Sequence, residues 1–217
     1  MTNKTRPEDI KFAVLATDVV VFQVQNWELN VLLTKARTPE FKDMWALPGG
    51  LIKPTEDVDK APARYLEMLL GKTKSHIEQF HAFGKVNRDP RGRVVSLAYL
   101  ALIPPYLHKF KKSDKFFESE WFNVKNVPSL AYDHNEILKT ALIKLKERVE
   151  LTNAIKTLMP SEFTLTELQN TYEIVLGEAL DKRNFRKRVE AMDFLEKLDK
   201  KKEGHAHRPA QLYKIKS

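Results

Sequence analysis

The sequence predicts a mixed α/β (α+β) fold divided into two domains, and three observations support this prediction. The chain has 217 residues, more than one compact domain usually needs. Segments rich in β-branched residues alternate with helical patterns, which predicts a mixed sheet sandwiched by helices. Near residue 150 a shorter and more basic part begins. We therefore expect one domain over 1–150 and a second over 151–217.

The first domain is expected to open with a β-hairpin. Residues 10–36 hold two extended segments separated by a polar break. Residues 45–52 form a further short apolar segment, interrupted by a Pro-Gly-Gly turn that needs the backbone freedom of glycine. A helix of about 16 residues should follow, beginning near Glu56 and ending at Gly71, a natural C-terminal cap.

The other elements of this domain follow from the same kinds of pattern. Extended segments are predicted at 78–83, 93–104 and 120–124, and a polar loop at 87–92 joins the first two. Residues 135–149 carry apolar side chains at the three-to-four spacing of an amphipathic helix. This helix is expected to close the first domain.

The last part of the chain is predicted to form a winged helix-turn-helix. A capping box at Thr164 starts a helix of about 12 residues. Asp181 is placed to cap a second, basic helix over 182–192. Two alternating segments, 195–200 and 211–216, enclose a basic turn. Helix, turn, basic helix and hairpin in this order are typical of a winged helix.

Composition excludes several classes of protein. A hydrophobic fraction of 42% with 30% charged residues is typical of folded, globular material. The absence of cysteine excludes disulfides and thiolate metal sites and is compatible with a reducing cytosol. The first residues lack the apolar core of a signal peptide, and no run approaches the ~20 apolar residues that span a bilayer. We expect a cytoplasmic protein without membrane association.

The net charge is positive and unevenly distributed. Lys and Arg number 37 against 29 Asp and Glu, a formal charge of +8, which favours nucleic acid, nucleotide phosphates or an anionic membrane surface as partner. A generally basic proteome is the alternative explanation. From Asp181 onward, however, 12 Lys and Arg face 6 Asp and Glu, so about three-quarters of the net charge lies in the last sixth of the chain.

The segment Gly50–Gly71 resembles the Nudix box, a motif of glycine, glutamate and arginine at fixed spacing. The matching positions are Gly50, Glu56, Arg64, Leu66 and Gly71. Nudix hydrolases cleave a nucleoside diphosphate linked to a further group, and carboxylates on the box helix hold the divalent cations that polarise the diphosphate. The resemblance implies a Nudix-type mixed sheet for the first domain.

The metal-binding positions of this box are changed. Tyr65 follows the box arginine, and Met68 and Leu69 replace a Glu-Glu pair. These side chains do not bind Mg²⁺, so we expect no catalytic residue, no metal site and no cofactor. Glu67 lies at the variable position and is turned by about 100° from position 68. Glu56 and the box arginine are expected to form an ion pair that stabilises the fold, or to act as two separate charges at the helix ends.

What remains of the box is a glycine-rich turn beside basic residues. Such a turn approaches a phosphate closely and donates backbone amides to it, and arginines add two-point hydrogen bonds. For each single cation a solvated surface position is the more ordinary explanation, and only the group favours a ligand. The expected effector-binding residues are Arg37, Gly49, Gly50, Lys53, Arg88, Asp89, Arg91 and Arg93.

Three further side chains have two interpretations. Trp45 and Phe83 are large enough to stack on a base, but a large aromatic residue in a strand more often belongs to the core. His134 lies at a predicted helix start, where a lone histidine usually makes a cap or a buried hydrogen bond. We therefore treat none of the three as a ligand.

Several segments along the chain match one family pattern: the altered box, 87–96, Tyr132-Asp133-His134, 163–169, 181–188 and 208–213. On these segments, nearly the whole chain resembles the Nudix-related transcriptional regulators, the NrtR family. The resemblance implies a Nudix-like domain that binds a small effector, typically ADP-ribose or a related product of NAD turnover. It also implies a winged helix that binds double-stranded operator DNA as part of a homodimer. The usual targets are genes of NAD synthesis and salvage, and the effector releases the repressor.

The basic helix supplies most of the expected DNA contacts. Its N-terminal part carries Arg and Asn side chains able to read guanine and adenine edges, and later cations are expected to hold phosphates. Phe185, Val189 and Met192 form its buried stripe. A charged, solvated helix is the alternative. The predicted DNA-binding residues are Lys182, Arg183, Asn184, Arg186, Lys187, Arg188, Lys201, Lys202, His207 and Arg208.

The sequence leaves other functions open. Close relatives of the family respond to sugars such as arabinose, so a pentose is an alternative effector. An atypical Nudix hydrolase of ADP-ribose-like compounds would use Glu56 and Glu67 as metal ligands. A pure interaction module would carry the basic tail but bind no effector.

Overall fold

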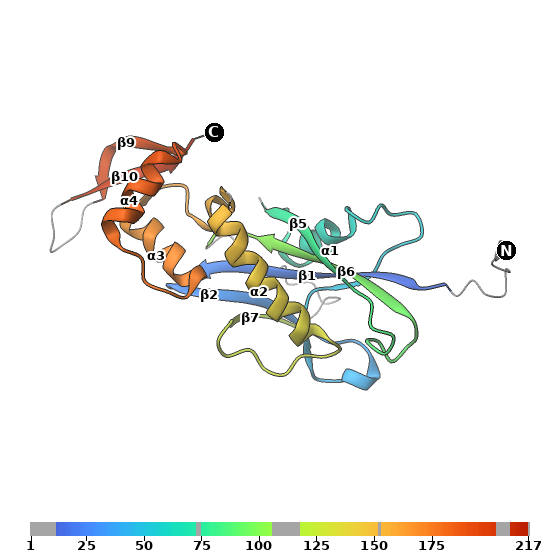
Figure 1. Cartoon of the computed structure of the whole chain (residues 1–217). Coiled ribbons are helices and arrows are strands. Elements are labelled where there is room, and N and C mark those ends of the chain that lie inside the picture. Colours follow the sequence, from blue (N-terminus) through green and yellow to red (C-terminus); the bar gives the residue numbers. More distant parts are fainter. Residues whose placement is uncertain (1–11, 73–74, 106–117, 152, 203–208, 217) are drawn as a thin grey trace, which may run out of the picture.

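The computed structural model describes residues 12–72, 75–105, 118–151, 153–202 and 209–216. The first group of elements is β1 (Val14–Gln25), β2 (Glu28–Lys35), η2 (Pro39–Phe41), β3 (Trp45–Ala46), β4 (Gly49–Leu51), α1 (Ala61–Leu70), β5 (His76–Phe83), β6 (Val94–Leu102), β7 (Ser119–Asn123) and α2 (His134–Leu151). The second group is η3 (Asn153–Leu158), β8 (Phe163–Thr164), α3 (Leu165–Leu176), α4 (Lys182–Ala191), β9 (Leu195–Lys202) and β10 (Ala210–Ile215). This order confirms the predicted α+β class (Figure 1).

The first sheet is mixed because its central strand has neighbours of both directions. β1 runs antiparallel to β2 and parallel to β6, and β5 returns antiparallel to β6. β3 and β7 extend β2, while the short β4 pairs with β1. The tight turn of the predicted hairpin is made by Asn26 and Trp27, whose φ angles of 53° and 61° are both positive.

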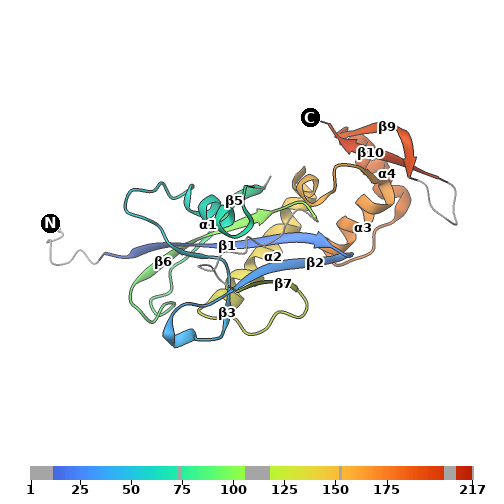
Figure 2. The same ribbon diagram turned by 180° about the vertical axis from the view of Figure 1, so that it is seen from behind.

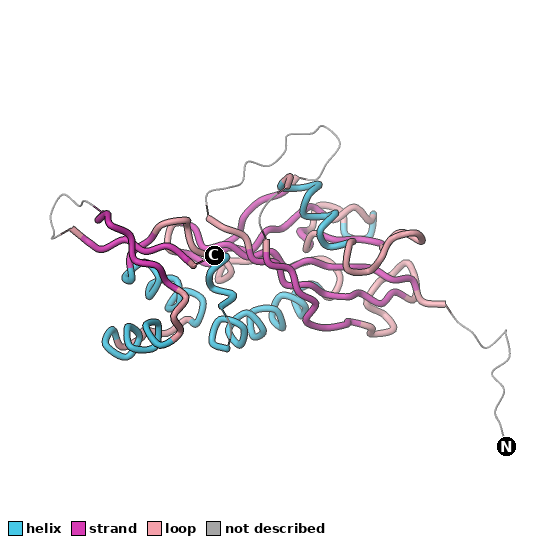
Figure 3. The backbone as a smooth tube through the Cα atoms, turned by 90° about the horizontal axis from the view of Figure 1, so that it is seen from above, coloured by secondary structure: helices cyan, strands magenta, loops and turns pink. Residues whose placement is uncertain are grey.

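Two helices cover opposite faces of this sheet. Side chains alternate along β1, so Val20 and Phe22 join the core cluster that contains α2, whereas Val19 and Val21 join the cluster that contains α1. Figures 2 and 3 show the sheet from behind and from above, with helices on both sides of the strands. The predicted sandwich of sheet and helices is therefore confirmed.

The predicted start of the box helix is wrong. α1 begins at Ala61, whereas the pattern predicted a start near Glu56; the end before Gly71 is as predicted. The Glu56 carboxylate accepts hydrogen bonds from the Lys53 amide and from Arg64, which folds 53–60 back on the helix as turns. Proline in the first helical turn lacks an amide hydrogen and is favoured only at such a start.

The C-terminal part is a helix-turn-helix followed by a hairpin. The Thr164 hydroxyl accepts from the Glu167 amide and the Glu167 carboxylate reaches back to the Thr164 amide, so the predicted capping box is confirmed. The Asp181 side chain accepts from the Asn184 amide and caps α4 as predicted. β10 lies between β8 and β9 and closes the small sheet. Gly177, with φ of 77°, ends α3.

One hydrophobic core runs through both parts of the molecule. Leu145 and Val149 of α2 belong to the same cluster as Tyr172 of α3 and Phe185 of α4. α2 thus contacts the first sheet along its length and α3 near its end. Among the described residues, none of the helices combines the length and hydropathy needed to cross a lipid bilayer.

Candidate functional site: an anion-binding cleft and a basic helix

A cleft of about 330 Å³ opens beside Gly49 and Gly50. Its walls come from β1, the end of β2 and the loop after it, β3, β4, α1, the loop before β6 and the residues at the start of α2. The volume is within the range of small-molecule sites. Five cationic side chains line it, Lys35, Arg37, Arg64, Arg88 and Arg91, against two carboxylates, Asp18 and Asp89. This excess of positive charge favours an anionic ligand.

These two glycines are required by close packing. A Cβ atom on Gly49 would collide with the Thr17 carbonyl oxygen, because β4 pairs closely with β1 at this point. Gly50 has φ of 148°, and a Cβ atom there would collide with the Tyr65 hydroxyl. The predicted Pro-Gly-Gly turn is therefore wrong at both glycines, which belong to strand β4. On the cleft side, the missing side chain of Gly50 leaves its backbone open beside Tyr65, where a phosphate can approach closely.

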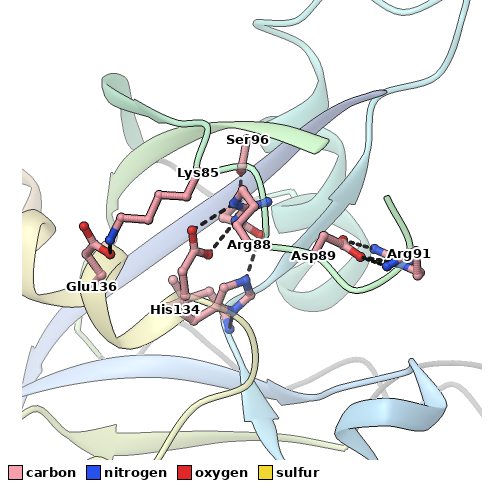
Figure 4. A network of polar contacts seen from close by, with 10 residues as sticks. Lys85, Arg88, Asp89, Arg91, Ser96, His134 and Glu136 are labelled. Carbon is pink, nitrogen blue, oxygen red and sulfur yellow. Dashed lines mark hydrogen bonds and ion pairs between the residues drawn. The ribbon is translucent and has the colours of Figure 1, made fainter. Parts of the chain in front are cut away.

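The floor of the cleft is a buried network around Arg88 (Figure 4). Its guanidinium donates to both oxygens of Asp133, at 2.9 and 2.7 Å, and to Oδ2 of Asp18 at 3.0 Å. Ser96 Oγ donates to the same Asp18 oxygen at 2.6 Å. With its side chain only 3% exposed, Arg88 is committed to these carboxylates. It shapes the cleft and leaves direct ligand contact to other cations.

Asp18 is a buried charged residue of the cleft that the sequence analysis missed. It is 5% exposed in the middle of β1, among apolar neighbours. Burial by itself raises the pKa of the Asp18 carboxyl, but His134, Arg88 and Ser96 outweigh burial and bring this pKa down to about 2. The sequence signal that could have identified Asp18 is a single carboxylate inside a run of β-branched residues.

His134 links this network to the backbone segment before β4. Its Nδ1 accepts a hydrogen bond from the Leu47 amide at 2.8 Å, so that nitrogen carries no proton. Nε2 lies 3.4 Å from Oδ1 of Asp18. The ring is 4% exposed and begins α2. The expected buried, hydrogen-bonding role of this histidine is confirmed.

Asp89 and Arg91 form a separate pair at the edge of the cleft. Arg91 donates to Asp89 at 2.9 Å from Nε and at 2.6 Å from Nη2, which lowers the pKa of the Asp89 carboxyl and raises that of the guanidinium. The Arg91 side chain remains 48% exposed and so stays open to a ligand. Figure 4 shows this pair beside the buried network.

Two of the eight predicted effector-binding residues lie outside the cleft lining. Lys53 is exposed, and its amide donates to Glu56. Arg93 is exposed and donates to the Gly84 carbonyl at 2.5 Å, which turns it along the loop. The residues that the structure brings together around the cleft are Arg37, Gly49, Gly50, Arg88, Asp89 and Arg91.

The box helix presents no carboxylate to the cleft. Tyr65 and Met68 line it, whereas Leu69 is 5% exposed in the core. Glu67 is exposed and does not line the cleft. Glu56 forms the expected ion pair with the box arginine. Over the described ranges, no group of three or more metal-ligating side chains is clustered.

Tyr132 lines the cleft together with Tyr65, whereas the sequence pointed to Trp45 and Phe83 as aromatic residues able to stack. Trp45 packs edge-on against Phe122 at 4.9 Å, and Phe83 is 7% exposed in the core, so the core interpretation holds for both. The Tyr132 hydroxyl lies 2.8 Å from Thr38 Oγ1. Its backbone φ of 55° is unusual for a bulky residue, the kind of strain that accumulates at functional sites.

The second candidate surface is the exposed face of α4. Phe185 and Val189 are buried and Met192 is half-buried, as expected for the inner stripe. The polar residues Lys182, Arg183, Asn184, Arg186 and Lys187 are exposed. Within the described part of the chain, the side chains of the two lysines and two arginines among them make no hydrogen bond or ion pair, which leaves them open to an anionic partner.

Other predicted DNA contacts have partners inside the molecule. Arg188 donates to the Glu150 carbonyl oxygen at 2.8 Å. Lys202 contacts the Glu167 carboxylate at 2.5 Å and thereby ties the hairpin to α3, while Lys201 is exposed. His207 and Arg208 lie outside the described residues.

Two family models match the chain. The "NUDIX domain" model matches residues 14–142, and the "NrtR DNA-binding winged helix domain" model matches residues 155–215. The first match falls on the large sheet with its cleft, and the second on the helix-turn-helix with its hairpin.

Two curated relatives are similar in sequence. The "ADPR responsive transcriptional repressor NtrR" of Acinetobacter baylyi is 34% identical over 213 residues, which cover 95% of this chain and 84% of the relative. The "ADP-ribose pyrophosphatase" of Methanocaldococcus jannaschii is 32% identical over 110 residues, 51% of this chain and 64% of that relative. Only the repressor is matched over nearly the whole chain.

Solved structures of a third protein match both parts. The crystal structure of Shewanella oneidensis NrtR complexed with a 27mer DNA has a TM-score of 0.80 at 28% identity, covering 93% of each chain. The NUDIX domain of that protein complexed with ADP ribose has a TM-score of 0.55 at 28% identity, covering 67% of this chain and 99% of that one.

Proposed function

The chain belongs to the NrtR family of Nudix-related transcriptional regulators, and from that premise we propose that it is a repressor whose Nudix domain binds ADP-ribose, or a close NAD metabolite, without cleaving it. One observation carries the proposal. A cationic cleft opens on the bare Gly49-Gly50 backbone, yet Tyr65, Met68 and Leu69 occupy the positions where a Nudix hydrolase needs carboxylates. Such a site recognises a diphosphate and lacks the means to activate water against it.

The effector assignment rests on the chemistry of the cleft. ADP-ribose carries two phosphates, and Arg37 and Arg91 in the cleft lining offer the charged hydrogen-bond donors that phosphate oxygens prefer. The proposal is supported by the relative described as ADPR responsive and by the NUDIX domain solved with ADP ribose. A pentose, the alternative effector, has no charge to match these cations.

The DNA assignment rests on α4 and the hairpin. We propose that residues 151–217 bind operator DNA, with Arg183, Asn184 and Arg186 toward base edges and Lys182 and Lys187 toward phosphates. A single winged helix covers a short stretch of DNA, so a homodimer on a two-fold operator is part of the proposal. The Nudix domain, 1–150, then acts as the effector domain of each subunit.

An operator-binding titration tests the proposal. A labelled duplex from the region upstream of the protein's own gene is titrated at about 0.15 M salt, with and without ADP-ribose, beside a scrambled duplex. We expect tighter binding to the upstream duplex, weakened by ADP-ribose and unaffected by arabinose. Equal binding of both duplexes that disappears at this salt concentration would argue against a regulator.

The pyrophosphatase relative makes hydrolysis the second candidate function. That relative matches only the Nudix part of this chain. If the chain were a hydrolase, ADP-ribose would be converted to AMP and ribose 5-phosphate in the presence of Mg²⁺ or Mn²⁺. We expect ADP-ribose to be recovered intact, because the box helix offers no carboxylate to the cleft.

A further inference from the structure

Both ends of α2 are fixed by polar contacts, one at the cleft and the other at the DNA-binding helix. At its start, Asp133 pairs with Arg88 and His134 accepts from the Leu47 amide. At its end, the Glu150 carbonyl oxygen accepts a hydrogen bond from Arg188 of α4 at 2.8 Å. With 18 residues, α2 spans about 27 Å between these contacts.

The contact of Arg188 has a physical cause in the helix itself. The last carbonyl groups of α2 have no amide partners within the helix and carry the negative end of its dipole. An arginine placed there satisfies an open carbonyl and opposes that partial charge. The same guanidinium lies 5.9 Å from the ring centre of Tyr172, which belongs to the core shared by α2, α3 and α4.

Arg188 therefore differs from the other cations of α4. The side chain of Arg186, two residues earlier, is exposed and makes no hydrogen bond or ion pair within the described part of the chain. Arg188 is exposed as well, but its hydrogen bond ties α4 to the end of α2. A side chain engaged in this way is poorly placed to neutralise a phosphate.

The other end of α2 is connected to the ligand-facing backbone. Leu47 lies two residues before Gly49, and its amide donates to the first residue of the helix. A ligand seated on the glycine backbone acts on the backbone segment that His134 holds. The helix is also packed along one face, where Ile137, Ala141 and Leu145 are fully buried, so displacement of its start is transmitted along its length.

We propose that α2 transmits the effect of ligand binding in the cleft to the DNA-binding surface. In this proposal Arg188 is a positioning residue that holds α4 on the end of α2, and it is not a phosphate contact. This inference rests on the proposed function, because it names how ADP-ribose acts on DNA binding. It reassigns Arg188, which the sequence analysis grouped with the phosphate contacts.

Arg188→Gln and Arg186→Gln form a matched pair for the test, since both remove one guanidinium from the same helix. Operator affinity is measured over a salt series, with and without ADP-ribose, for both variants and the unmodified protein. Arg186→Gln is expected to lower affinity and to reduce the slope of log affinity against log salt by about one, leaving the ADP-ribose response unchanged. Arg188→Gln is expected to keep the slope and to reduce the ADP-ribose response at least about threefold.

The outcomes separate this inference from the proposed function. A slope reduced by about one in Arg188→Gln, or an ADP-ribose response equal to that of the unmodified protein, overturns the positioning role. If the unmodified protein does not respond to ADP-ribose, the proposed effector fails, while the salt slope of Arg188→Gln still decides whether Arg188 contacts phosphate.

Discussion

Arg64 grips Glu56 through two hydrogen bonds, Nε to Oε1 at 2.5 Å and Nη2 to Oε2 at 2.7 Å. Both carboxylate oxygens are thus engaged, and the arginine lowers the pKa of Glu56 to about 2. In a Nudix hydrolase the carboxylates of the box helix serve metal ions. Here the carboxylate of Glu56, at the matched position of the box, holds the turn that precedes α1 by accepting from the Lys53 amide. From the helix itself, the phenol of Tyr65 and the thioether of Met68 line the cleft.

The depressed carboxyl pKa values predict a loss of stability in acid. Asp18 and Glu56 both have a pKa near 2, below their ordinary values of 3.8 and 4.5. A carboxyl group whose pKa is lower in the folded protein stabilises the fold at any pH above its unfolded-state pKa. That stabilisation is lost as the pH falls toward the pKa of the group in the folded protein. For buried Asp18 we expect this loss of stability to fall between about pH 4 and pH 2.

Urea denaturation at a series of pH values, on the unmodified protein and on Asp18→Asn, checks this prediction. The variant should be less stable at neutral pH and should show a shallower decline in acid. Parallel curves for the two proteins would mean that Asp18 contributes no such dependence.

Restoring carboxylates to the box helix should have opposite consequences at neighbouring positions. Leu69 is 5% exposed in the core, so Leu69→Glu buries an unpaired charge and should lower the free energy of unfolding by about 3 kcal/mol or more. Met68 lines the cleft, so Met68→Glu should fold normally. Its carboxylate should repel the diphosphate and weaken ADP-ribose binding roughly tenfold in EDTA.

Denaturation and calorimetric titration of both variants provide the measurements. Comparable loss of stability in Met68→Glu and Leu69→Glu would contradict the placement of the two side chains.

Tyr172 has the one buried polar atom without a hydrogen-bond partner among the described residues, its hydroxyl. Tyr172→Phe removes an unsatisfied group and is expected to raise the free energy of unfolding by up to about 1 kcal/mol. Tyr132→Phe is the control, because its hydroxyl lies 2.8 Å from Thr38 Oγ1 and its loss should cost about 1 kcal/mol. Denaturant titrations that rank the two variants in the reverse order would refute this account.

Alanine substitutions at Gly50 and Gly92 distinguish the effect of backbone strain from the effect of steric crowding in the cleft. Their φ angles of 148° and 144° are equally unfavourable for alanine, at about 1–3 kcal/mol. A Cβ atom on Gly92 meets nothing within 4 Å, whereas one on Gly50 collides with the Tyr65 hydroxyl in the cleft. Gly50→Ala should therefore lose ADP-ribose affinity, and Gly92→Ala should lose only stability. Thermal-shift titration with ADP-ribose distinguishes these results; equal affinity in both variants would dismiss the crowding argument.

Local patterns predicted most of the fold because each depends on neighbours in the chain. The hairpin, the capping box at Thr164 and the cap at Asp181 are short-range features, and all three are present. The start of α1 was misplaced because Glu56 is held by a residue eight positions away. Propensity and periodicity carry no information about such a contact.

The candidate site was less predictable because it is assembled from distant segments. Arg88, Asp18 and Asp133 come from three separate parts of the chain. Only the fold reveals that the Arg88 guanidinium is hydrogen-bonded to both carboxylates. The same holds for Arg188, whose partner is a backbone carbonyl 38 residues earlier. Charge alone grouped these arginines with Arg183 and Arg186, whose side chains make no hydrogen bond or ion pair within the described part of the chain.

Binding of ADP-ribose in the presence and absence of divalent cation, with the nucleotide analysed afterwards, tests recognition without cleavage most directly. The account predicts the same affinity in EDTA and in Mg²⁺, and ADP-ribose recovered unchanged after prolonged incubation. Binding that requires Mg²⁺, or release of AMP at a rate that depends on the metal, would contradict it.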